Sequence, residues 1–314
     1  MRELDRVGDR GGTSASDPPD ATSEAAELGL RRARATPPPA AGAAPTITIT
    51  SERRWRGFGL AELWDRRDLC FFLAWRDVKV RYQQTVLGIA WAVLQPFLTM
   101  VVFTLLFGRL ARVPSEGEPY AIFSYAALLP WNFFAGAVGN AGNSLVGSAN
   151  LITKVYFPRL VIPVAAVGAA LVDFAIAAVI LFVMMPWYGV AFTPSLLMFP
   201  VLAFLTAVVA AGIGMWLSAL NVKYRDVRYA LPFVLQLWMF VTPVIYPLSL
   251  VPGRWRWLVS LNPLSGIIEG FRAAIFGRPF DWSALALSAA IAAAILVYAA
   301  YAFRRMESEF ADLI

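Results

Sequence analysis

The sequence predicts an all-α membrane protein with six transmembrane helices, an N-terminal amphipathic interface helix, and two short outer half-helices between spans five and six. Two observations support this prediction. First, 59% of the 314 residues are hydrophobic and 15% are charged, with a mean hydropathy of +0.61, whereas soluble domains are about 45–50% apolar and about 25% charged. Second, the apolar residues gather in runs long enough to cross a bilayer. Lipid is therefore the expected solvent for most of the chain.

The N-terminal 50 residues differ from the rest in composition. Residues 1–50 have no apolar core and include the proline-rich stretch PPPAAGAAP at 37–45. Such a segment buries too little apolar surface to fold and lacks the apolar region of a signal peptide. We expect a disordered cytoplasmic tail over 1–50, followed by one membrane domain over 51–314.

A basic amphipathic helix is predicted over 58–84, directly before the first span. Phe71, Trp75, Val78 and Tyr82 share one helical face, while the rest carries charges that include Arg76, Lys79 and Arg81. Such a helix lies at the membrane interface. Two roles remain open: a simple membrane anchor, or a docking surface for a cytoplasmic protein.

Six apolar runs are predicted as spans. They cover 86–108, 121–145, 160–186, 195–220, 230–247 and 283–303. The second contains AGAVGNAGNS, whose small residues let helices approach closely. Lysine and arginine concentrate before span one, after spans two and four, and after span six, which predicts that both termini are cytoplasmic. The arginines between spans five and six run against this pattern locally.

Two short loops are predicted on the cytoplasmic side. SANLITKVYFPRLVIP at 148–163 combines charge, aromatic rings and helix-breaking prolines, so it suits a rigid, force-transmitting contact. LNVKYRDVRYALP at 220–232 is more simply a basic turn. For both loops, the basic turn is the alternative to a docking role.

The outer segment 248–282 contains two apolar stretches, 255–261 and 264–276, each too short to span. Proline and glycine separate them, which predicts two half-helices. Glu269 precedes Arg272 by three residues, so a helix-surface ion pair is expected rather than a catalytic carboxylate.

The titratable residues exclude several functions. The chain has no histidine and one cysteine, Cys70, which removes histidine-based catalysis, histidine-ligated metals and internal disulfides. Gly-Lys never occurs, so there is no P-loop. The net charge of +6 is attributed to cytoplasmic loops and lipid headgroups rather than to nucleic acid. Asp173 is the only carboxylate deep in a span, where it either bonds to polar neighbours or relays protons.

With these residues in view, the chain resembles the permease subunits of ABC-type polysaccharide exporters, which move lipid-linked O-antigen, teichoic acid or related cell-envelope glycans. The resemblance covers roughly 55–314. The stretches that carry it are RDVKVRYQQTVLGIAWAVLQP at 76–96, LITKVYFPRLVIP at 151–163, LNVKYRDVRYALPFVLQLWMFVTPVIYP at 220–247, LNPLSGIIEGFRAAIFG at 261–277 and RRMESEFADLI at 304–314.

The resemblance implies a homodimer of six-span subunits in the bacterial plasma (inner) membrane, bound to two copies of a separate ATPase that holds ATP and Mg. This chain would then carry no cofactor and no catalytic residue. The residues implied in ATPase coupling are Asn150, Lys154, Tyr156, Phe157, Pro158, Arg76, Lys79 and Arg81. Those implied in an outer gate are Trp255, Trp257, Pro263, Glu269 and Arg272.

A glycan path requires aromatic faces for sugar rings and polar groups for hydroxyls. The candidate lining residues on the first two spans are Trp91, Phe97, Tyr125, Trp131 and Phe134. The alternative for each ring is an interfacial belt or a lipid contact. Other functions also remain open: a permease for a drug or small lipid, a membrane-embedded transferase, or an ion-coupled transporter that depends on Asp173.

Overall fold

The computed structural model describes residues 64–83, 90–154, 157–307 and 310, all within the unit Arg56–Ile314. The tail predicted over 1–50 lies outside the described residues. Every regular element in the described ranges is helical, which confirms the all-α prediction. In chain order the elements are α3 (Arg67–Gln83), α4 (Ala90–Phe103), η1 (Thr104–Leu110), α5 (Tyr120–Gly147), α6 (Ala149–Lys154), α7 (Val161–Trp187), η2 (Pro194–Met198), α8 (Phe199–Lys223), α9 (Val227–Val241), η3 (Leu248–Leu250), α10 (Gly253–Ser260), α11 (Pro263–Phe276) and α12 (Trp282–Glu307).

Five helical segments among the described residues are long and apolar enough to cross a membrane. They are Ala90–Leu110, Tyr120–Gly147, Val161–Trp187, Pro194–Lys223 and Trp282–Glu307. The predicted fifth span, 230–247, is instead the 15-residue helix α9, which ends at Val241. Proline disfavours helical geometry in the residue before it, so Pro243 ends the helix. The described residues thus contain five candidate spans and one shorter apolar helix.

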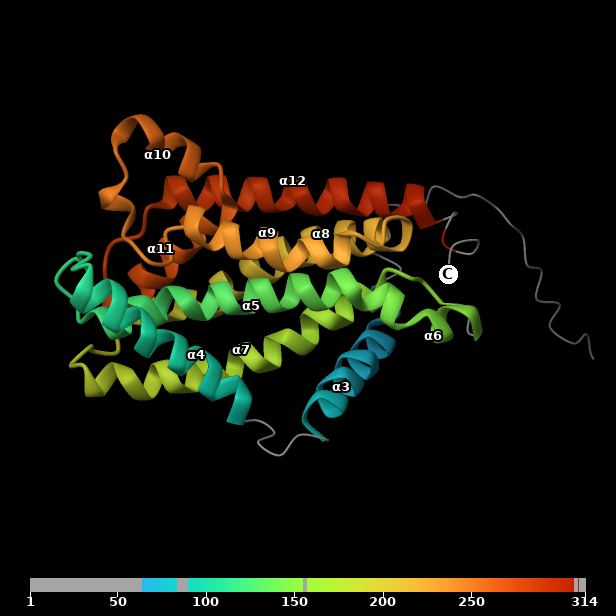
Figure 1. The fold of residues 1–314 in the computed structure, drawn as a ribbon, viewed down its shortest axis with the longest axis horizontal. Helices are drawn as coiled ribbons and strands as arrows, with labels where there is room; N and C mark the ends of the chain where they lie inside the picture. The colour runs from blue at the N-terminus through green and yellow to red at the C-terminus, as the bar shows by residue number, and fades with distance from the viewer. Residues whose placement is uncertain (1–63, 84–89, 155–156, 308–309, 311–314) are drawn as a thin grey trace, which may run out of the picture. The chain divides into compact units, whose positions relative to one another are not determined.

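Helix α5 lies at the centre of the bundle (Figure 1), where it packs most extensively against α7 and α8, while α12 packs on α8. Small residues allow the close α5–α8 contact. A Cβ added at Gly214 of α8 would lie 2.6 Å from the Cβ of Ala141 on α5. One added at Gly142 of α5 would lie 3.6 Å from the Cβ of Leu217 on α8 and 3.0 Å from Leu231 on α9. The small residues of the second predicted span therefore serve helix packing.

The Gly214→Ala variant should be destabilised by about 1–3 kcal/mol, because the new methyl group meets the Ala141 methyl and forces α5 and α8 apart. The matched control is Gly136→Ala on α5, where a Cβ meets nothing within 4 Å. The apparent unfolding midpoint in detergent measures both. Equal midpoints for the two variants would contradict the close-packing interpretation.

The bundle has two ends, named here by the short helices that lie there (Figure 1). At the α11 end are α10, α11 and η1. At the α6 end are α6 and the last turn of α12. The predicted half-helices 255–261 and 264–276 correspond to α10 and α11, which confirms two short helices in this segment; their position on the outer side stays a prediction. Asn262 caps α11 by accepting a hydrogen bond from the Leu264 N–H at 3.1 Å.

Helix α3 runs beside α7 (Figure 1), and Ala74 faces Gly168 across that contact. The predicted apolar face of α3 is not buried in the bundle: Phe71 and Trp75 are exposed, and Val78 and Tyr82 are half-buried. Leu73, which was not assigned to that face, is instead buried against α7 and its neighbours. Leu73 is thus part of the packing surface that attaches α3 to the bundle.

Candidate functional site

An irregular segment after α9 is held by side chains at the α11 end. The carbonyls of Val244, Ile245 and Tyr246 have no helical partner, and each accepts a bond from a distant side chain. Arg272 donates to Val244 at 3.0 Å and to Tyr246 at 3.3 Å, and the Tyr120 hydroxyl donates to Ile245 at 2.8 Å. Non-helical backbone in an apolar setting requires such partners.

Arg272 is the most buried charged residue of this network, with a relative exposure of 1%. Its guanidinium pairs with Glu269 at 2.9 Å and lies 3.9 Å from the ring centroid of Phe123. The predicted i, i+3 ion pair is confirmed. Burial lowers the pKa of the guanidinium, and the Glu269 carboxylate opposes that shift. Arg272 thereby joins α11, the segment after α9 and the start of α5.

Other residues of the proposed outer gate lie around this network. Pro263 is buried at the first position of α11, whereas Trp255 and Trp257 project from α10 and are exposed. Arg278 pairs with Glu116, and Glu118 lies 3.7 Å from the same guanidinium. The loop before α5 is thus tied to the α11–α12 connection.

A second ion pair lies midway along α7. Arg81, near the end of α3, pairs with one carboxylate oxygen of Asp173, and the Tyr82 hydroxyl donates to the other. Burial and the hydrogen bond to Asp173 raise the pKa of Tyr82 to about 12, so its phenol keeps the proton that it donates. Both carboxylate oxygens are engaged, which supports the structural role for Asp173 over the proton relay.

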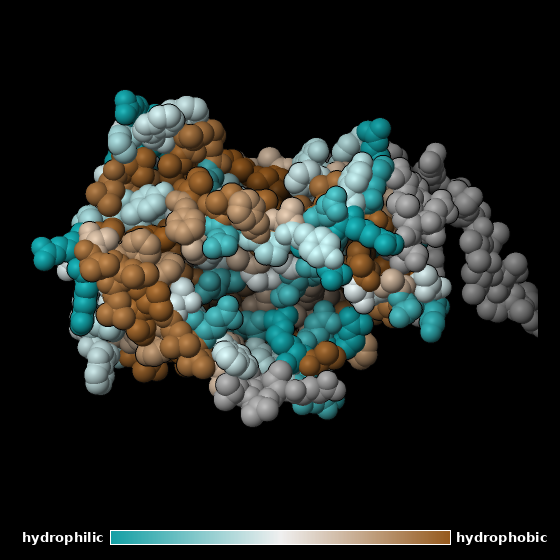
Figure 2. All heavy atoms as spheres, in the orientation of Figure 1, coloured by the Kyte–Doolittle hydropathy of each residue, from teal (hydrophilic) through white to brown (hydrophobic). Residues whose placement is uncertain are grey.

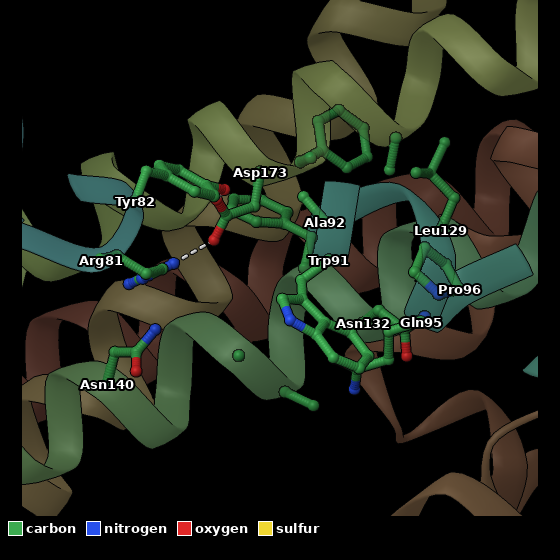
Figure 3. A pocket seen from close by; sticks show the side chains of 15 residues that line it. Arg81, Tyr82, Trp91, Ala92, Gln95, Pro96, Leu129, Asn132, Asn140 and Asp173 are labelled. Atoms are coloured by element: carbon green, nitrogen blue, oxygen red, sulfur yellow. Dashed lines mark hydrogen bonds and ion pairs between the residues drawn. The ribbon is translucent and has the colours of Figure 1, made fainter. Parts of the chain in front are cut away.

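A hollow of about 450 Å³ opens beside this ion pair, between α3, α4, α5 and α7. Figure 3 shows Arg81 and Tyr82 converging on Asp173, with Trp91, Gln95 and Asn132 across the hollow. The amides of Gln95, Asn132 and Asn140 make no hydrogen bond within the described ranges. These donors and acceptors are available to a ligand.

The hollow continues toward the α6 end. A second hollow of about 590 Å³ shares Arg81 and Asn140 with the first and extends past Asn143 and Gly147 to Asn150. We call the two hollows together the polar track. It follows one face of α5, because residues four apart on a helix share a face. Figure 2 shows hydrophilic side chains along this part of the surface, beside the apolar surface of α4.

The five aromatic residues predicted to line a channel differ in their exposure and in whether they line a hollow. Trp91 is half exposed and lines the first hollow, and Phe97 is exposed on α4 outside it. Tyr125, Trp131 and Phe134 are buried in the core, where the Tyr125 hydroxyl donates to Ala177 and Phe134 packs edge-on against Trp238. Neighbouring helices cover these three rings in this arrangement, so they do not line the track.

Only some of the residues predicted to couple the chain to an ATPase lie together along the second hollow. Arg76, Arg81 and Asn150 line the second hollow, and Arg76 pairs with Asp77 at 2.8 Å. Lys79 and Lys154 are exposed and do not line it.

The loop after α6 meets the C-terminal segment. Phe157 and Pro158 are half-buried, while Tyr156 lies outside the described residues. Arg159 donates to the carbonyl of Glu307 at 2.7 Å and lies over the ring of Phe310, which is buried. The end of the chain therefore braces the loop that follows α6.

The sequence analysis did not predict that the side-chain amides of Gln95, Asn132 and Asn140 line a hollow. Their position inside apolar spans could have indicated it, since asparagine and glutamine are uncommon there unless they form hydrogen bonds across helices or bind a ligand. The stretch AGAVGNAGNS was interpreted only as a packing surface. It provides both the close contact with α8 and, on another face, part of the polar track.

Five candidate spans in the described part of the chain, three of which line the polar track, define a multi-pass helical membrane protein. Residues 68–276 match the family described as "ABC-2 type transporter", and the chain belongs to that family. It is 31% identical to an O-antigen export system permease protein of Myxococcus xanthus over 81% of this chain and 98% of the relative. A similarly named protein of Klebsiella pneumoniae is 26% identical over 79% of this chain and 95% of the relative. A polysialic acid transport protein of Escherichia coli is 24% identical over 64% of this chain and 78% of the relative.

Proposed function

We propose that this chain is the membrane-spanning subunit of an ATP-driven exporter that moves a lipid-linked polysaccharide from the cytoplasmic to the outer face of a bacterial inner membrane. The observation that carries the proposal is the similarity, over nearly the whole length of the relative, to an O-antigen export permease. The relatives do not favour a drug or small lipid as cargo.

The polar track supports a carbohydrate cargo. Amide side chains exchange hydrogen bonds with hydroxyls, and the exposed ring of Trp91 offers a face to a sugar ring. Such contacts are individually weak, so a polymer can slide past them.

The proposed assembly is a homodimer with two copies of a separate ATPase, both permease termini being cytoplasmic. In it the shorter helix α9 would serve as the fifth of six spans, and α3 would serve as the interface helix. The α6 end would face the ATPase, and the α11 end would face outward.

ATP and Mg would bind the partner, because the chain contains no Gly-Lys and hence no P-loop. Closure of the ATPases would act on α6, the loop after it and α3, and the cargo would leave past α10 and α11.

The first test is purification of the tagged chain from its native membrane in a gentle detergent, followed by an ATP hydrolysis assay. The proposal expects a stoichiometric P-loop partner with activity that lipid-linked glycan stimulates. A pure homo-oligomer without ATPase activity would contradict it.

Coupling can be tested with the double variant Tyr156→Ala and Pro158→Ala. Export per ATP hydrolysed should fall on the order of tenfold, within the usual range of coupling free energies. Trp187→Ala, exposed at the opposite end of α7, is the control. Normal export with normal glycan-stimulated hydrolysis in the double variant would exclude the coupling role.

A further inference from the structure

We infer that the polar track selects an uncharged glycan and that the ion pairs along it exclude acidic polymers. This inference rests on the proposed function and adds the chemical class of the cargo. Family membership alone leaves that class open, since the relatives include both O-antigen permeases and a protein named for polysialic acid.

The charged residues that line the track are all paired. Arg76 binds Asp77 at 2.8 Å, and Arg81 binds Asp173. The described lining therefore carries two cations and two anions, with no net charge. A second copy of the chain in the proposed homodimer would double both signs equally.

A polyanion would meet an unfavourable surface here. Each carboxylate or phosphate needs a cation when it leaves bulk water, yet both arginines of the track are already engaged by aspartates. Displacing Asp173 from Arg81 would leave that half-buried aspartate without a cation and with the Tyr82 hydroxyl as its donor, which is unfavourable. Acidic cargo would also be repelled by Asp77 and Asp173.

A neutral glycan meets the opposite situation. The amides of Gln95, Asn132 and Asn140, which have no hydrogen-bond partner among the described residues, each present a donor and an acceptor. Sugar hydroxyls also donate and accept, so they can satisfy these amides without disturbing the ion pairs. The track is thus matched to hydroxyls rather than to charge.

The experiment uses proteoliposomes that contain the full chain with its co-purified ATPase. The probes are two polyprenyl-linked oligosaccharides of equal length, one uncharged and one with a carboxylate in each repeat. Wild-type protein should transport the uncharged probe at least about tenfold faster. Equal transport of both, or preference for the acidic probe, would overturn the inference. Transport of neither probe by a complex that hydrolyses ATP would overturn the proposed function as well.

Charge variants at Asn140 test whether the track causes the selectivity. Asn140 is exposed on α5, so both signs can be introduced there. Asn140→Lys should raise the acidic-to-neutral transport ratio by about tenfold, and Asn140→Asp should lower it. An unchanged ratio in both variants would overturn the inference.

Asp173→Asn should also raise that ratio, because it leaves Arg81 without its counter-ion. Its matched control is Asp68→Asn on α3, a fully exposed aspartate that does not line the track. If Asp173→Asn fails to fold, the Asn140 pair decides the question. An equal rise in Asp68→Asn would assign the effect to overall charge and overturn the inference.

Discussion

Replacing Arg272 by alanine is expected to destabilise the protein by about 3–5 kcal/mol, the cost of breaking a buried charge network. Arg272 is 1% exposed, and its guanidinium donates to the carbonyls of Val244 and Tyr246 and to Glu269. Its removal takes the donor from the buried Val244 carbonyl and the partly buried Tyr246 carbonyl and opens a void beside Phe123. Glu269 keeps the Leu248 N–H but loses its cation. The apparent unfolding midpoint in detergent should fall by about 10 °C or more.

Arg272→Lys should recover only part of this loss. One ammonium group cannot reproduce the planar fork that reaches two carbonyls and a carboxylate while stacking on Phe123. Arg254→Ala on α10, where the side chain is exposed, is the control and should stay within about 0.5 kcal/mol of wild type. A midpoint for Arg272→Ala equal to that of the control would show that the segment after α9 does not depend on this arginine.

The second large effect is expected at the ion pair between α3 and α7. Asp173→Ala removes the acceptor of both Arg81 and Tyr82. The Arg81 and Asp173 side chains remain 34% and 29% exposed, so the expected loss is about 1–3 kcal/mol, below the about 3–5 kcal/mol of a fully buried pair. Detachment of the end of α3 should also impair export, since α3 is proposed to contact the ATPase.

The exchanged pair Arg81→Asp with Asp173→Arg separates charge pairing from other roles of these residues. It should recover part of the stability lost in each single variant, as a double-mutant cycle measures. The readouts are the detergent unfolding midpoint and glycan-stimulated ATP hydrolysis. Strictly additive losses in the double variant would mean that the two side chains do not interact.

Local sequence signals predicted much of the fold. Long apolar runs located four spans to within a few residues: 121–145, 160–186, 195–220 and 283–303 correspond to α5, α7, η2 with α8, and α12. Proline and glycine located the ends of the two half-helices, since Pro252 caps the start of α10, Pro263 is the first residue of α11, and Gly277 ends α11 in a left-handed conformation. The Glu269–Arg272 pair followed from helical spacing alone. These features depend on neighbours in the chain, which a sequence displays directly.

The aromatic residues show where local reasoning fails. Trp91 and Tyr125 appear equivalent in sequence, since both are amphipathic rings in apolar spans. In the structure Trp91 is half exposed and Tyr125 is fully buried. Tyr125 lies on a face of α5 that α7 covers, where its hydroxyl donates to the Ala177 carbonyl, whereas Trp91 lies at the start of α4 beside the first hollow. Apolar spans carry no strong pattern that marks their covered face.

Composition and local periodicity are enough to predict a helical membrane protein, most of its helices and the Glu269–Arg272 pair, and the sequence contains no P-loop and no histidine. The partners of Asp173, the backbone carbonyls that bind Arg272 and the course of the polar track depend on the tertiary structure. Asp173 meets Arg81 across 92 residues of chain, and Arg272 meets Val244 across 28. Such pairs form only where packed helices bring distant residues together. A buried charge or a carbonyl without a helical partner is costly unless one of these distant residues pairs with it.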